Sequence, residues 1–444
     1  MDRLVEEIQS VLGNNEDFVQ SRDYLADTSV ILLGFSTLVD FTKTKMTLQK
    51  HSESFISQDR SSDDLWCAIG KLIEGDVKKA ISSIYVGKLV IIIENTSRFI
   101  IMDPVSKILD RSIESPSNEN VIQGPLNSFT ENIDINIGIV RKQVNSNELH
   151  LKTYSTGHNV KKKLSLFYID GKADTKLLDN LMEHIEKNIN MEIDDLQGLS
   201  NMMGFRSWDA VSKFNTTELP LYAVQFLKKG RVILFVDQFP FALILPSHLL
   251  DMFILENDRN FPLPIMVSIR FVRVIGLLVT LICPGLYVAL VAVNPEILQI
   301  QLALSVAQSR EGVPYPALIE IILMLVILEL ILEASVRLPK SIGPTITMVG
   351  GIILGQAVVE AKLVSNLLII ILAATTIANS TIVGFQNSVS IRLFKYVIVF
   401  LASIFGLLGI VAGLVLIGAY LASINTYGRS YLDINMKGTE SNNE

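Results

Sequence analysis

Two long stretches without a charged side chain divide this chain of 444 residues into unlike halves. Residues 274–293 and 396–428 contain no Lys, Arg, Asp or Glu, whereas charged and polar side chains are interleaved throughout residues 1–264. A run of about 20 apolar residues forms a helix of about 30 Å, which matches the hydrocarbon core of a bilayer. The sequence therefore predicts a soluble N-terminal half followed by a membrane-embedded helical half.

Charge and motif content narrow the possible functions. The net charge of −7 and the lack of a long basic run argue against nucleic acid as a partner. The five histidines show no ligand spacing, and the two cysteines, Cys67 and Cys283, cannot form a zinc cluster alone. Because no nucleophile–base pair and no phosphate-binding glycine loop is present, we expect neither an enzyme nor a cofactor. The acidic start, "MDRLVEEIQS", is unlike a secretory signal, so we expect a cytoplasmic soluble half.

The soluble half contains an internal repeat. Residues 80–103 align with residues 223–246 without a gap, and in both a short helical stretch ends at a glycine before two apolar strands joined by a turn. A further strand, turn and helix precede each copy, at residues 29–40 and 164–187. This pattern predicts two related mixed α/β subdomains, although short apolar strands also resemble one another by chance.

The membrane half is predicted to contain about five transmembrane helices. They fall at residues 274–293, 317–336, 342–359, 363–385 and 396–424. Residues 297–308 are short and mixed with Gln, which suits an interfacial or re-entrant segment, so the choice between five and six spans stays open. Arg392 and Lys395 then belong to a cytoplasmic loop. The predicted domain boundaries are 1–115, 116–264, 265–425 and a polar tail at 426–444.

Proline and glycine mark special positions in these spans. Pro284 removes a backbone hydrogen bond in the middle of the first span, so we expect a kink there and a hinge at Pro284 and Gly285. Gly351 and Gly355 are four residues apart in the third span, as are Gly409 and Gly413 in the fifth. Small residues at this spacing let helix backbones touch, within one chain or between chains.

Three carboxylates interrupt the second span, "LIEIILMLVILELILEASVRLPK". Glu329 and Glu333 share one helix face, Glu320 lies near the opposite face, and Glu333 is placed to pair with Arg337 four residues on. We expect Glu329 to be the carboxylate most exposed to low dielectric. A charged carboxylate facing lipid costs about 3 kcal/mol, so it must face a helix or water, or be protonated.

Two roles remain open for these carboxylates. They either hold helices together or line an ion path that an oligomer repeats around a ring. Gln356 and Glu360 in the third span allow the same two interpretations.

Several motifs resemble those of the A subunits of GerA-type spore germinant receptors. Residues 310–365 contain "REGVPYP", "RLPKSIG" and "GQAVVEA", which are similar to the family's long signature. Upstream, residues 121–144 are similar to its GP…FTE…N…IR segment. The resemblance covers nearly the whole chain.

The chain also departs from the family pattern. Leu219 and Leu221 replace a charged pair in "TELPLY", and Leu325 and Leu332 stand where Glu and Arg are expected. Residues 426–431, "TYGRSY", differ from the family's C-terminal pattern SFGxPY. An auxiliary paralogue similar to the stage V sporulation AF protein is therefore the alternative to a receptor subunit.

The resemblance implies a role in a complex of the spore inner membrane. The partners that the resemblance implies for this chain are a permease-like B subunit and a lipoprotein C subunit. The A subunits are implied to form a homo-oligomer, with a pentamer as the expected size, that acts as a germinant-gated ion channel. A scaffold that anchors the permease-like partner without conducting ions is the rival interpretation.

Overall fold

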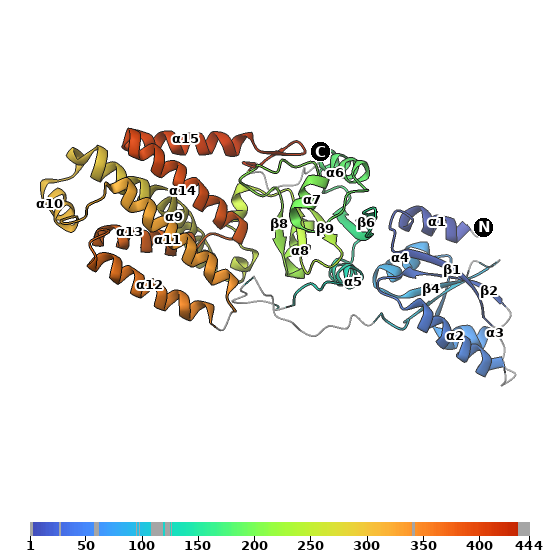
Figure 1. The fold of residues 1–444 in the computed structure, drawn as a ribbon. Helices are drawn as coiled ribbons and strands as arrows, with labels where there is room; N and C mark the ends of the chain where they lie inside the picture. Colours follow the sequence, from blue (N-terminus) through green and yellow to red (C-terminus); the bar gives the residue numbers. More distant parts are fainter. Residues whose placement is uncertain are drawn as a thin grey trace.

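The computed structural model describes residues 3–25, 28–56, 62–94, 96, 98–107, 119, 125, 127–339 and 342–433. Figure 1 shows two α/β bodies followed along the chain by a long bundle of helices. The predicted succession of an α/β region and a helical C-terminal region is confirmed.

The two α/β bodies are built from the same succession of elements. The first has α1 (Arg3–Leu12), β1 (Phe18–Leu25), β2 (Thr28–Phe35), α2 (Phe41–Ile56), α3 (Ser62–Ile69), β3 (Lys71–Glu74), α4 (Val77–Tyr85), β4 (Leu89–Ile93) and β5 (Arg98–Met102). The second has α5 (Ile133–Gln143), β6 (Leu149–Thr156), β7 (Lys162–Ile169), α6 (Thr175–Lys187), α7 (Leu196–Met202), β8 (Asn215–Thr217), α8 (Pro220–Lys228), β9 (Val232–Val236) and β10 (Ala242–Leu245).

Strand order confirms that these bodies are related. The sheets run β1-β2-β4-β5-β3 and β6-β7-β9-β10-β8, and each strand occupies the same place as its counterpart. All the described pairings are antiparallel, including the expected hairpins β4–β5 and β9–β10. The boundary expected near residue 116 falls in a stretch outside the described residues.

Burial on both faces explains why the central strands are apolar without alternation. In β9, Ile233 and Phe235 pack with α5 and α8 on one face of the sheet. Val232, Leu234 and Val236 point to the other face and pack with α6 and α7. Successive side chains alternate between faces, so a strand covered on both sides is hydrophobic at every position.

A buried ion pair joins the two subdomains. The guanidinium of Arg141 on α5 donates to both carboxylate oxygens of Asp17, at 2.7 and 2.5 Å, and to Asn15 at 3.0 Å. Thr37 donates to the same carboxylate, and the guanidinium lies over the ring of Phe35. Because Arg141 is only 2% exposed, its charge has little access to water and depends on these partners.

The helical region contains more helix segments than the sequence predicts. Within the described residues its helices are α9 (Leu263–Val288), α10 (Ile300–Ser309), α11 (Ala317–Arg337), α12 (Gly343–Glu360), α13 (Asn366–Asn379), α14 (Phe385–Phe405) and α15 (Leu407–Ser423), and α9 continues into a π-helical turn at Ala289–Val293. Of these, Leu263–Val293 and Phe385–Phe405 are long and apolar enough to cross a bilayer. The prediction of about five spans therefore stays a prediction.

The expected fourth and fifth spans are wrong in their boundaries. Arg392 and Lys395 lie inside α14 rather than in a loop, and the stretch predicted as one fifth span breaks at Gly406 into α14 and α15. Gly406 has a φ of 62°, where side chains other than glycine's are strained. A side chain also does not fit at this position, because an added Cβ would overlap with the side chain of Asn294.

Six helices, α9 and α11–α15, alternate in direction. The start of α14 and the end of α15 both reach the second subdomain, because Ala210 accepts from Ser390 at 2.6 Å and donates to Tyr420 at 2.7 Å. The link from α12 to α13 is short, and α12 packs mainly against α11.

The chain after α15 returns to the second subdomain. Strands β11 (Asn425–Thr426) and β12 (Arg429–Ser430) form a small hairpin. Arg429 pairs with Asp174 at 2.6 Å, and the backbone of Tyr431 accepts a hydrogen bond from Leu249. Residues 425–433 therefore lie on the same side of the helices as the soluble half, whereas five spans would have placed them opposite.

The ion pair of Arg141 yields a stability prediction. Arg141→Ala should lower the free energy of unfolding of the soluble half by about 3–5 kcal/mol, because Asp17 is then buried without its counter-charge. Lys142→Ala is the control, since Lys142 follows on the same helix and is exposed. Urea unfolding of the full chain in detergent, followed by the fluorescence of buried Trp66 in a Trp208→Phe background, measures the difference. Equal midpoints for the two variants would contradict the role of Arg141.

Candidate functional site: polar clusters among the helices

Glu320, not Glu329, is the most deeply buried of the three carboxylates on α11. Its side chain is fully inaccessible, although the sequence predicts Glu329 to meet the lowest dielectric. Its oxygens accept from the backbone N–H of Ser365 at 2.6 Å and from the hydroxyl of Tyr287 at 3.3 Å. Arg310 lies 3.4 Å away and supplies the counter-charge.

The Glu320 cluster fastens three helices together. Tyr287 belongs to α9 and Glu320 to α11, while Ser365 is the N-cap of α13 and accepts from the N–H of Leu368. A carboxylate at a helix N-terminus satisfies an otherwise unpaired N–H and interacts favourably with the helix dipole. The cluster lies at the end of the bundle far from the soluble half.

Glu329 forms a second cluster between α11 and α14. It accepts from Arg392 at 2.7 Å and lies 3.7 Å from the ammonium of Lys395. Lys395 and Arg392 are nearly buried, whereas Glu329 keeps 30% of its side chain exposed. Two cations of α14 therefore meet one carboxylate of α11.

The remaining predicted polar residues lie on the outside of the chain. Glu333 pairs with Arg337 at 2.6 Å as expected, but their side chains are 62% and 78% exposed. Gln356 and Glu360 on α12 are exposed and lie outside both clusters. The structure thus brings Glu320 and Glu329 into contact with other helices and leaves the other four at the surface.

The predicted hinge lies in a continuous helix. α9 runs through Pro284 and Gly285 without a break, and its irregular part is the π-helical turn that follows at Ala289–Val293. Gly285 serves close packing, since an added Cβ would lie 2.9 Å from Ile398 on α14. A hinge at this position stays a prediction.

The two glycine pairs differ in their surroundings. A Cβ at Gly409 would overlap with the carbonyl oxygen of Leu401, and one at Gly413 would lie 3.0 Å from Ile398. This pair therefore lets α15 pack directly on α14. Among the described residues, no atom lies within 4 Å of a Cβ built at Gly351 or Gly355, so that face of α12 is open there.

An acidic segment connects the soluble half to α9. We call residues 249–260 the junction segment; it contains two short 3-10 turns, Leu249–Met252 and Glu256–Asn260. Asp251 binds Arg231 through two hydrogen bonds of 2.7 Å, and Glu256 pairs with Lys229. Lys229 and Arg231 lie in the link between α8 and β9, so these pairs connect the junction segment to the second sheet.

The other end of the junction segment binds the first long helix. Asp258 accepts from both terminal nitrogens of Arg273 on α9, at 2.5 and 2.9 Å, and lies 3.5 Å from Arg270. Asp258 is 2% exposed, so these contacts are made away from bulk water. The sequence pattern did not predict the junction pairs, although the acids of "LENDRN" precede the two arginines in the first half of α9.

Charge pairing affects the pKa of Asp251 in the junction segment. Burial by itself raises the pKa of Asp251, but the guanidinium of Arg231 outweighs it and holds the pKa below its ordinary value. The ordinary value is about 3.9. Because the pKa of Asp251 is depressed in the folded protein, its ionised carboxylate stabilises the fold at pH values above its ordinary pKa. This stabilisation is lost as the pH falls through the pKa of the folded protein. Burial also lowers the pKa of nearby Lys229.

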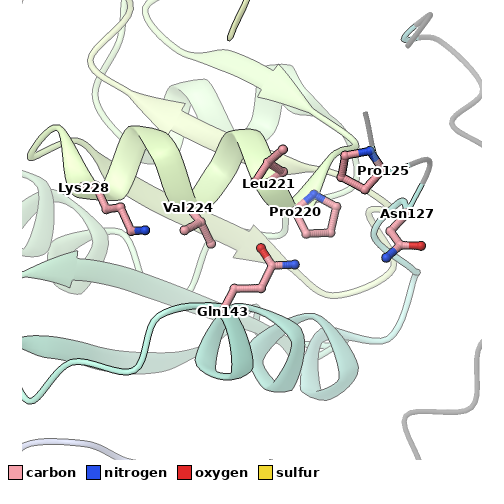
Figure 2. Close-up of a pocket in the computed structure, with 7 residues that line it drawn as sticks. All are labelled: Pro125, Asn127, Gln143, Pro220, Leu221, Val224 and Lys228. Carbon is pink, nitrogen blue, oxygen red and sulfur yellow. The ribbon is translucent and has the colours of Figure 1, made fainter. Parts of the chain in front are cut away.

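A small hollow lies between α5 and α8. Its volume is about 260 Å³, and it is lined by Pro125, Asn127, Gln143, Pro220, Leu221, Val224 and Lys228 (Figure 2). Leu221 is one of the positions where the resemblance to the family leads us to expect a charged residue. The hollow falls below the 300–1,000 Å³ of ordinary small-molecule sites, and its lining is mainly apolar.

Comparison with known proteins places the chain in a family. The model of the Bacillus/Clostridium GerA spore germination protein matches residues 6–442. Spore germination protein A1 of Bacillus subtilis (strain 168) is 31% identical over 430 residues, or 96% of this chain and 88% of that protein. The membrane protein YfkQ of the same strain is 34% identical over 363 residues, or 81% and 70%.

A solved structure was also matched. The N-terminal domain of the A subunit of the Bacillus megaterium spore germinant receptor GerK3 covers 55% of this chain and 93% of its own, with 21% identity and a TM-score of 0.41. By the family model and its relatives, the chain belongs to the GerA family of spore germination proteins. This confirms the resemblance of its sequence motifs.

The glycine contacts of α15 yield a matched prediction. Gly409→Ala should destabilise the helical region, because the new methyl group meets the Leu401 carbonyl. Gly418→Ala on the same helix meets no atom of the described part of the chain within 4 Å and should be neutral or stabilising by up to about 1 kcal/mol, from helix propensity. The measurement is the temperature at which half of the detergent-solubilised protein is lost from its size-exclusion peak. Equal temperatures would contradict direct packing of α15 on α14.

Proposed function

We propose that this chain is a membrane subunit of a spore germinant receptor, which transduces nutrient sensing into ion release. Its soluble half lies in the cytoplasm and its helices lie in the spore inner membrane, beside a permease-like subunit and a lipoprotein subunit. The observation that carries the proposal is the family match over residues 6–442. Relatives that are named spore germination proteins align over most of the chain.

The junction segment provides a route for the signal. It is bound to the second sheet through Asp251 and Glu256 and to α9 through Asp258. Because each of these acids is buried and paired, a movement of the sheet against the bundle cannot leave the pairs unchanged. A displacement in the soluble half therefore reaches α9 through defined contacts.

The Glu329 cluster is the proposed gate. In the closed form Glu329 neutralises part of the charge of Arg392 and Lys395 and holds α11 against α14. If Glu329 separated from Arg392 and Lys395, its carboxylate would be exposed at membrane depth, where the carboxylate can attract a cation. The partial exposure of Glu329, and the exposed pair Glu333–Arg337 on the same helix, leave this face of α11 accessible.

Oligomerisation supplies the ring that such a path needs. α12 packs mainly on α11 and presents Gly351 and Gly355 to the outside, where a sister subunit can approach closely. We propose a homo-oligomer, with a pentamer as the expected size, assembled through this face.

A non-conducting scaffold is the second candidate. This candidate is supported by the pairing of Glu320 and Glu329 with cations of the same chain. Carboxylates that only hold helices together would be paired in this way. In this case the subunit anchors the permease-like partner and no ion passes through it.

Potassium flux from proteoliposomes separates the two functions. Glu329→Gln should leak potassium faster than the unmodified protein, because the amide cannot hold two cations against α11. Glu329→Asp keeps the charge and should leak less than Glu329→Gln. Glu311→Gln, at an exposed loop position, should behave as the unmodified protein. If all four proteins incorporate equally and none leaks, the channel is excluded and the scaffold is retained.

A further inference from the structure

We propose that the turn at residues 206–209 is a membrane anchor, which seats the indole of Trp208 among lipid headgroups at the bilayer surface. This inference rests on the proposed membrane location of the helices. Trp208 is 97% exposed, whereas the other tryptophan, Trp66, is 4% exposed and lies in the core of the first subdomain. A fully exposed indole is unusual in water, but is typical of the interface between lipid and water.

The turn is rigid and holds the indole outward. Ser207 and Trp208 occupy its centre, and Asp209 donates its backbone N–H to the carbonyl of Arg206. The hydroxyl of Ser207 bonds to Asn201 at 2.9 Å. Asp209 pairs with Lys213 at 2.7 Å, so its charge is neutralised beside the indole.

Hydrogen bonds fix the depth of this turn against the helices. Ala210, two residues after Trp208, bonds to Ser390 on α14 and to Tyr420 on α15. Ser390 lies five residues after Phe385, the first residue of α14. At 1.5 Å per residue this places Ala210 about 7–8 Å inside the end of the helix.

The neighbouring helix surface is apolar and exposed at the same level. Phe385 is 64% exposed, Val389 41% and Leu393 54%, all on α14. Phe385–Phe405 is one of the two helices long and apolar enough to cross a bilayer. Acyl chains that cover Val389 and Leu393 then reach the level of the turn, where the exposed Arg206 can bind a lipid phosphate.

Tryptophan fluorescence in lipid nanodiscs tests the anchor. The Trp66→Phe variant leaves Trp208 as the single emitter, and lipids brominated high on their acyl chains report its depth. We expect strong quenching by these lipids, weaker quenching by lipids brominated near the chain ends, and protection from aqueous iodide. If Trp66→Phe misfolds, the difference between the unmodified protein and Trp208→Phe gives the same signal.

A position on the first subdomain provides the control. Tyr24 is 72% exposed on β1, so Tyr24→Trp in a background of Trp66→Phe and Trp208→Phe should be open to iodide and unaffected by brominated lipid. Free access of iodide to Trp208 would overturn the anchor. Protection from iodide without lipid quenching would also overturn it, because another protein copy then covers the indole. A chain that does not enter nanodiscs would instead contradict the membrane location itself.

Discussion

The pairing of buried charges is the constraint on which this structure depends. An ionised group away from water is tolerated only beside a counter-charge and hydrogen-bond partners. Arg141 with Asp17 sets the two subdomains against each other, and Asp258 with Arg273 sets the second subdomain against α9. Glu320 and Glu329 then fasten helices within the bundle. The Arg141–Asp17 and Arg392–Glu329 pairs join parts of the fold that are far apart in sequence.

These pairs leave the carboxylates of α11 with different roles. Glu320 is sealed between α9, α11 and α13, where it satisfies a helix N-terminus and fits a fixed structural position. Glu329 faces two cations and remains partly exposed, which fits a contact that can open. Glu333 is at the surface with Arg337. Glu329 is therefore the residue that we propose as the gate, because its counter-charges lie on α14 and neutralise it only while α11 and α14 stay together.

The sequence predicts the soluble fold well, because its strands are short, apolar and repeated. The counterparts β4 and β9 occupy equivalent places, and the preceding glycines mark both helix ends. The helical half is harder to predict, because a charge-free run does not reveal where a helix turns back. Gly406 ends α14 inside such a run. Arg392 and Lys395 lie within α14, where their charges are partly neutralised by Glu329 on α11. Spacing along α11 correctly predicts the Glu333–Arg337 pair, but cannot show that Ser365 and Arg310 enclose Glu320.

In the function that we propose, movement of the soluble half reaches the helices through the contact between Asp258 and Arg273. A double-mutant cycle with Asp258→Asn and Arg273→Gln tests this route, with germinant-triggered cation release measured in spores at matched protein levels. We expect each single variant to slow release and the double variant to be no slower than the slower single, because both substitutions remove one contact. Normal release from either single variant, or losses that multiply in the double variant, would contradict it.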